Sequence, residues 1–62
     1  MPLITEPNLY SPDDFYADLI AAHEGLSDEE SEALNSRLIL ILSNHIGERK
    51  TLKQALEAAK KS

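Results

Sequence analysis

The stretch from Ser27 to Gly47 places the strongest constraint on the fold, because it combines the longest apolar run, residues 38–42, with clear signals for the start and end of a helix. Ser27 and Glu30 have the spacing of a capping box, in which each side chain accepts a hydrogen bond from the other residue's backbone amide. Gly47 suits the left-handed conformation that ends many helices. The pattern predicts one helix over residues 28–46, with both flanking segments packed against it.

The apolar side chains of this predicted helix cover a wide arc. With about 100° per residue, one face contains Leu34, Leu38, Ile41, Leu42 and His45. A second line at heptad spacing contains Glu30, Ala33, Arg37, Leu40 and Asn44. Two interpretations of this second line stay open: a contact surface around a central leucine, or a solvated face with one exposed leucine.

The segment before this helix carries a second set of start signals. Ser11 suits an N-cap, and Pro12 suits the first helical position, where a missing amide costs nothing. Tyr10 and Phe15 have the spacing of a hydrophobic staple across the cap. We expect a helix over residues 12–24, joined to the next helix by a link short enough to favour an antiparallel helical hairpin.

A third helix is predicted near the carboxyl end. Apolar residues recur there at the i, i+3, i+4 and i+7 spacing of one helical face: Leu52, Ala55, Leu56 and Ala59. Thr51 and Gln54 have the spacing of a second capping box, although the helix can also begin earlier, near Glu48. This helix is expected over residues 49–61.

Residues 1–10 are expected to form an extended arm, because Pro2 and Pro7 lack amide donors and push their predecessors toward extended geometry. No β-strand pattern is present. The predicted fold is all-α: one small three-helix domain over residues 11–62, made of the hairpin and the carboxyl-terminal helix, and preceded by this arm.

The short length and the composition limit the class of protein. A 62-residue chain makes one domain with a marginal core, and this chain has no cysteine to crosslink it. The absence of cysteine fits a cytoplasmic location, which we expect. No apolar run approaches the roughly 18 residues of a membrane span, and residues 1–10 lack a secretory signal pattern, so no membrane partner is expected.

The charge is negative and unevenly distributed. A net charge of −5 argues against nucleic acid as the main partner. Residues 1–36 hold nine acidic side chains and no lysine or arginine, whereas residues 37–62 hold six basic and two acidic side chains. The simplest interpretation of this asymmetry is that an acidic helix and a basic helix attract each other or are both solvated. We favour it over an electrostatic field that steers a ligand.

The residues with potential for chemistry have structural explanations. His23 and His45 lie near the ends of successive predicted helices, where imidazoles bond carbonyls and favour the dipole. A hairpin separates them too far to share a metal within one chain, although a dimer keeps that hypothesis open. Asp13, Asp14 and Asp18 fall in or near a first turn, where capping explains them better than catalysis does. We therefore predict no catalytic, cofactor-binding or metal-binding residue.

Polar residues beside the apolar arc mark the expected interface, because a buried polar side chain needs a partner. Arg37 is expected to meet a carboxylate of another chain or the arm. The interface candidates are Glu30, Ala33, Arg37, Leu40, Ile41, Asn44 and His45. The alternative is a small-ligand or metal-binding module centred on His45, Asn44 and Arg37.

The segment from Asp13 to Glu48 resembles a family of short bacterial proteins known only as a domain of unknown function. The matching elements are Asp13 to Tyr16, His23, Gly25 to Ser27, Leu34 to Leu38, and Asn44 to Gly47. The chain departs mildly from the pattern at Ser36 and Ser43, where alanine is expected, and at Glu48, where aspartate is expected. The resemblance implies no activity. It does imply that the gene lies beside genes for flavin-dependent oxidoreductases that break down aromatic compounds.

Three helices of this size cannot cover the wide apolar arc, so another polypeptide is expected to do so. We predict a non-enzymatic helical interaction protein, either a homodimer or a small accessory subunit of a larger bacterial enzyme. The resemblance suggests a flavin-dependent monooxygenase as that enzyme. Catalysis by the chain itself is not expected, because so short a chain has little room for a deep pocket.

Overall fold

The structure is a computed structural model that describes residues 2–61, and it contains three helices. These are α1 (Pro12–His23), α2 (Asp28–Ile46) and α3 (Arg49–Lys60). No strand occurs within this described range. The all-α, three-helix prediction is confirmed: α2 has the predicted bounds, and α1 and α3 each end one residue earlier than predicted.

The start and end of α2 follow the sequence signals. The amide of Glu30 donates to Ser27 Oγ at 3.2 Å, and the amide of Ser27 donates to Glu30 Oε1 at 2.9 Å. This reciprocal pair is the predicted capping box. At the other end Gly47 has φ 76°, and its amide donates to the Ser43 carbonyl at 2.8 Å.

Ser11 occupies the predicted N-cap position of α1 and Pro12 is the first helical residue, but the side chain of Ser11 does not cap the helix. Ser11 has a left-handed backbone, φ 48° and ψ 62°, and its side chain makes no cap hydrogen bond. An N-cap side chain reaches the first-turn amides from an extended backbone, which Ser11 lacks. The carbonyl of Ser11 instead accepts a bond from the Phe15 amide at 3.1 Å. Tyr10 is 95% exposed, so the expected staple with Phe15 does not form.

Helix α3 takes the earlier of its two expected starts. It begins at Arg49, directly after Glu48 in the N-cap position. The Thr51 hydroxyl donates to Glu48 Oε1 at 2.6 Å rather than capping the helix itself. Gln54 accepts a bond from the Leu3 amide at 3.2 Å, so it serves the arm and not a capping box.

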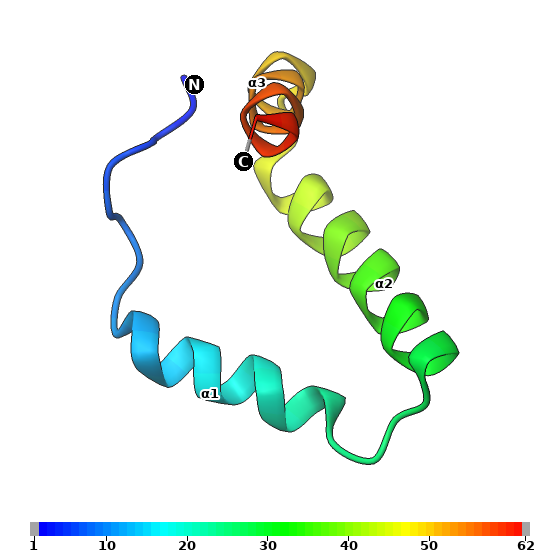
Figure 1. The fold of residues 1–62 in the computed structure, drawn as a ribbon. Helices are drawn as coiled ribbons and strands as arrows, with labels where there is room; N and C mark the ends of the chain where they lie inside the picture. Colours follow the sequence, from blue (N-terminus) through cyan, green and yellow to red (C-terminus); the bar gives the residue numbers. More distant parts are fainter. Residues whose placement is uncertain (1, 62) are drawn as a thin grey trace.

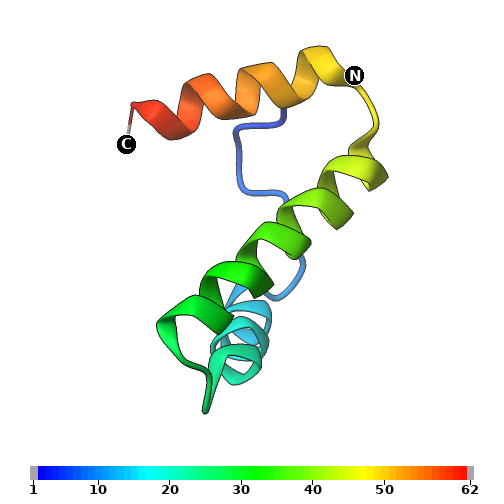
Figure 2. The ribbon, with the colours of Figure 1, turned by 90° about the vertical axis from the view of Figure 1, so that its right-hand side faces the viewer.

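The helices form an open arrangement (Figures 1 and 2). Helices α1 and α2 meet at the turn after His23 and then diverge, while α3 turns back at the far end of α2 and contacts it. The predicted hairpin therefore holds only at its corner. A short link fixes where two helices meet, whereas side-chain packing decides whether they stay together, and α1 leaves Phe15 and Ile20 43% and 50% exposed.

The arm brings Leu3 back to α3. Residues 2–10 contain no helix or strand, and both views show their first part beside α3 (Figures 1 and 2). A hydrogen bond from the Leu3 amide to Gln54 joins this part of the arm to α3. The arm thus spans the opening between α1 and α3, although most of its side chains stay exposed.

The described residues contain no buried hydrophobic side chain, and the one residue buried among them is Thr51, at 2% exposure. The radius of gyration is 13.3 Å, whereas a compact domain of this length has a value of about 10.6 Å. The fold is thus more open than a self-contained domain of its size.

Candidate functional site

The outstanding feature of the surface is the uncovered apolar run of α2. The side chains of Ile39, Leu40, Ile41 and Leu42 are 63%, 70%, 64% and 49% exposed. On the same helix Leu34 and Leu38 are only half-buried. Four consecutive helical residues point in four directions around the axis, so this exposure extends around most of the perimeter of α2.

The structure places all seven predicted interface residues on α2, and six of them are exposed. These are Glu30, Arg37, Leu40, Ile41, Asn44 and His45, while Ala33 is half-buried. Their spacing keeps the heptad line from residue 30 to residue 44 on one side of the helix. That side is open to solvent, as the interface hypothesis requires.

Glu30 has a second role at this surface, because its carboxylate belongs to the capping box. Hydrogen bonds from the backbone and then the side chain of Ser27 lower the pKa of the Glu30 carboxyl below its ordinary value. Bonds to the ionised form favour that form. The charged end of the predicted interface line is therefore held in place by the helix start.

A groove between α2 and α3 adjoins this exposed run. Its volume is about 450 Å³, and its lining is almost entirely apolar: Ile39 and Ser43 from α2, and Leu52, Ala55, Leu56 and Ala59 from α3. Serine and alanine have short side chains, which leave space where the two helices face each other. Leu56 is 63% exposed at its edge. This groove offers an apolar seat for another side chain or helix.

Sequence reasoning found half of the groove. The i, i+3, i+4, i+7 repeat identifies its α3 side, and the prediction that this segment packs against residues 28–46 agrees with the contact between α2 and α3. Ile39 and Ser43 were not among the interface candidates. Which residues of α2 face α3 depends on how the two helices cross, and no local spacing states that.

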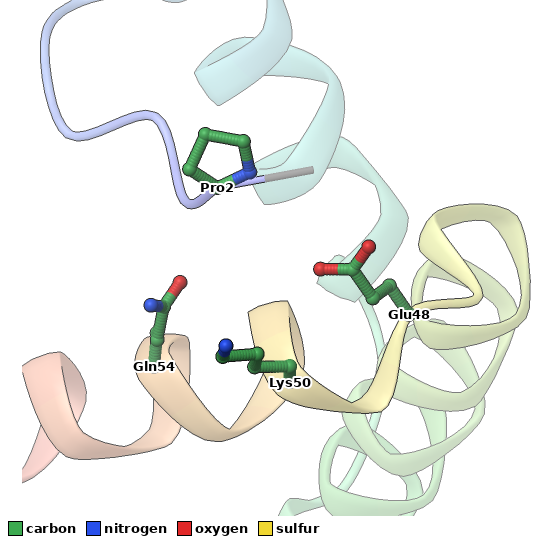
Figure 3. A pocket seen from close by; sticks show the side chains of 4 residues that line it. All are labelled: Pro2, Glu48, Lys50 and Gln54. Atoms are coloured by element: carbon green, nitrogen blue, oxygen red, sulfur yellow. The ribbon is translucent and has the colours of Figure 1, made fainter.

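A smaller, polar hollow lies between the arm and α3, and Figure 3 shows the four residues that line it. Pro2, Glu48, Lys50 and Gln54 surround a volume of about 200 Å³. Lys50 and Glu48 bring opposite charges to its rim. Because Gln54 also bonds the Leu3 amide, this hollow belongs to the seam that attaches the arm to α3.

The two histidines lie far apart: His23 ends α1, beside the start of α2, and His45 lies near the end of α2. His23 Nδ1 lies 3.0 Å from Ser31 Oγ, which ties the end of α1 to the first turns of α2. His45 is exposed near the other end, next to Asn44, and neither residue lines the two hollows above. Within residues 2–61 no group of three or more histidine, cysteine or acidic side chains is placed to hold a metal ion.

No helix in the described part of the chain is both long enough and apolar enough to cross a lipid bilayer.

A comparison with known families gives one match. The family described as "Protein of unknown function (DUF2783)" matches residues 3–61, nearly the whole chain. This confirms the resemblance found in the sequence to a family without an assigned activity. Neither the curated proteins nor the solved structures that were searched gave a match.

Proposed function

Because this chain belongs to the DUF2783 family, whose description assigns no function, we propose a role from the geometry: it is a non-catalytic helical interaction protein. It works as a homodimer or as a small accessory subunit of a larger bacterial enzyme. The exposed run of α2, together with the line from Glu30 to Asn44, is the surface that meets the partner.

One observation carries the proposal: the chain exposes far more surface than a self-contained domain does. Its accessible surface is 5691 Å², whereas a compact monomer of 6.9 kDa exposes about 4,000 Å². The excess of about 1,700 Å² exceeds the roughly 800 Å² that each partner contributes to a standard interface. The surface left open is therefore large enough for a stable complex.

The gain from covering that surface is substantial. Removing 300 Å² of apolar area from water at about 25 cal/mol per Å² is worth about 7 kcal/mol, before the costs of association. Whole domains have stabilities of about 5–15 kcal/mol. With no buried hydrophobic side chain in residues 2–61, much of the stability of this fold is expected to come from its partner.

Two substitutions on α2 test the proposal. Leu40→Asp places a charge in the middle of the exposed run, and Arg37→Ala removes the neighbouring guanidinium. Both residues are exposed, so neither change should reduce helicity much in circular dichroism. Asn8→Asp is the matched control, because it adds the same charge to the exposed arm, outside α2. We expect loss of assembly in the first two variants and not in the control.

The assembly is measured in two ways. Sedimentation across a concentration series reports self-association, and co-purification with a flavin-dependent monooxygenase, the larger enzyme implied by the resemblance, reports the accessory role. Wild-type protein that remains a folded monomer and binds no such enzyme would contradict the proposal. A metal or ligand lost in His45→Ala while assembly stays unchanged would favour the ligand-module alternative instead.

A further inference from the structure

Helices α1 and α3 carry stripes of the same spacing and opposite charge. On α1 the residues at i, i+3, i+7 and i+11 are Asp13, Tyr16, Ile20 and Glu24, the last being its C-cap. On α3 the residues at the same spacing are Arg49, Leu52, Leu56 and Lys60. Each stripe has an apolar middle and charged ends, acidic on α1 and basic on α3.

Both stripes are open to solvent. Tyr16 and Ile20 are 63% and 50% exposed, and Leu56 is 63% exposed. The α3 stripe forms one edge of the groove against α2, since Leu52 and Leu56 line it. The charged ends of both stripes are exposed as well.

The two stripes do not meet within one chain. Helix α1 follows the turn at the start of α2, whereas α3 lies at the far end of α2, and the two views agree on this separation (Figures 1 and 2). The attraction between acidic and basic helices that the sequence suggested is therefore unused inside the chain. In a pair of copies, the acidic stripe of each copy can meet the basic stripe of the other.

We propose that α1 of a second copy docks in the groove between α2 and α3, with its acidic ends over Arg49 and Lys60. This docking rests on the proposed function, because it identifies a second copy of the chain as the partner that covers part of the exposed surface. Two-fold symmetry makes the contact reciprocal, so each dimer contains it twice. Tyr16 and Ile20 of one copy cover Leu52 and Leu56 of the other, beside the small side chains of the groove floor.

The charge distribution of the chain and its excess exposed area both agree with α1 of a second copy in the groove. Residues 1–36 carry −9 and residues 37–62 carry +4, so reciprocal docking sets the acidic part of each chain against the basic part of the other. Lys60 forms an ion pair with Glu57 at 3.3 Å, and both side chains are well exposed. Such a surface pair contributes little and exchanges readily. The open area of about 1,700 Å² accommodates two helix contacts of ordinary size.

Charge reversal in pairs tests the docking. One variant, D13K/E24K, reverses the ends of the α1 stripe, and a second variant, R49E/K60E, reverses the ends of the α3 stripe. Each dimer has four such ion pairs, so each variant alone should dimerise at least roughly tenfold more weakly than wild type in sedimentation equilibrium. The wild-type dimer should also weaken as salt rises.

Mixing the two variants separates docking from damage to the fold. In a mixed dimer one of the two contacts pairs a reversed α1 with a reversed α3 and is restored, while the other keeps the original charges. The mixture should therefore form a heterodimer about as tight as the wild-type dimer, which misfolded chains would not do. A tagged copy of one variant identifies the heterodimer by co-elution.

The remaining outcomes distinguish the two proposals. A wild-type dimer that neither variant weakens, or variants that stay apart when mixed, would overturn the docking of α1 and leave the α2 surface as the interface. A wild-type chain that stays monomeric but binds the larger enzyme would also overturn the docking and would preserve the interaction role. A chain that does neither would overturn both.

Discussion

The two corners of this chain are built from similar parts but have different consequences. The first corner, from α1 to α2, has a glycine with φ 76°, the capping box of Ser27 and Glu30, and the contact of His23 with Ser31. The second corner, from α2 to α3, also has a glycine with φ 76°, and it precedes Thr51, the one buried residue in the described range. Helix α3 contacts α2, whereas α1 diverges from it.

This difference shows that hydrogen bonds at a corner do not by themselves create packing. The first corner has a complete capping box and a side-chain contact between two helices, but the helix that it positions leaves Phe15 and Ile20 largely exposed. The second corner brings side chains of two helices together, although the small residues there leave a groove. Hydrogen bonds fix the direction of the chain, and contact area decides how much stability follows.

The largest difference between the two corners is expected when the backbone of each is strained equally. Gly47→Ala and Gly25→Ala both place a side chain on a left-handed backbone, which costs about 1–2 kcal/mol for an ordinary residue. An added Cβ meets nothing within 4 Å at Gly25 and makes an ordinary 3.8 Å contact with the Asn44 carbonyl at Gly47. Differences between the two variants therefore reflect what each corner supports.

We expect Gly47→Ala to lower the free energy of unfolding by about 1–2 kcal/mol, and Gly25→Ala to lower it less. A shift of the first corner moves α1, which has little packing to lose, whereas a shift of the second corner separates α3 from α2. Chemical denaturation at one fixed protein concentration measures both values, because assembly affects apparent stability. Equal losses would show that α1 is as firmly packed as α3.

A second prediction concerns Thr51 at the packed corner. Thr51→Val keeps the shape of the side chain but removes the hydroxyl that donates to Glu48 at 2.6 Å. We expect a loss of about 1 kcal/mol in the free energy of unfolding, the usual net value of such a bond. Thr5→Val in the exposed arm is the matched control and should change little. A neutral Thr51→Val variant would show that the hydroxyl contributes nothing to this corner.

A third prediction concerns the contact between His23 and Ser31 at the open corner. A double-mutant cycle with His23→Ala and Ser31→Ala isolates the interaction from the cost of each truncation. We expect a coupling energy of about 0.5–1 kcal/mol, because the bond is only half-buried. Additive effects in denaturation would mean that this contact does not stabilise the corner.

The sequence predicted the helices well because their signals are local. The capping box of Ser27 and Glu30 involves residues three apart, and Gly47 ends α2 within one turn, so both follow from spacing alone. The repeat of Leu52, Ala55 and Leu56 likewise marked the apolar face of α3. Interactions of this range do not depend on where the rest of the chain goes.

What the sequence missed depends on distant contacts. Ser11 has the residue type of a cap, but its backbone is set by the path of the arm, which is held where Leu3 bonds Gln54, 51 residues away. The groove formed by Ile39, Ser43 and Leu56 depends on how α2 and α3 cross. The wide apolar arc of α2 did predict that much of this helix would be uncovered, because too few large side chains were present to cover it.

The smallest expected effect sharpens the comparison at the start of α2, where Glu30 belongs to the cap and to the exposed line. Hydrogen bonds from Ser27 lower the pKa of the folded-state carboxyl. A lowered pKa gives stabilisation that is fully present above the unfolded-state value, about 4.3 for glutamate, and is lost as pH falls through the lower folded-state value.

Glu30→Gln still accepts the bond from Ser27 but does not titrate, so the loss of stability below that range should be shallower than in wild type. Glu29→Gln, a neighbouring carboxylate outside the capping box, is the control and should keep the wild-type slope in acid denaturation. If both variants have the same slope, the cap does not depend on the charge of Glu30, and the hydrogen bonds alone position this end of the α2 surface.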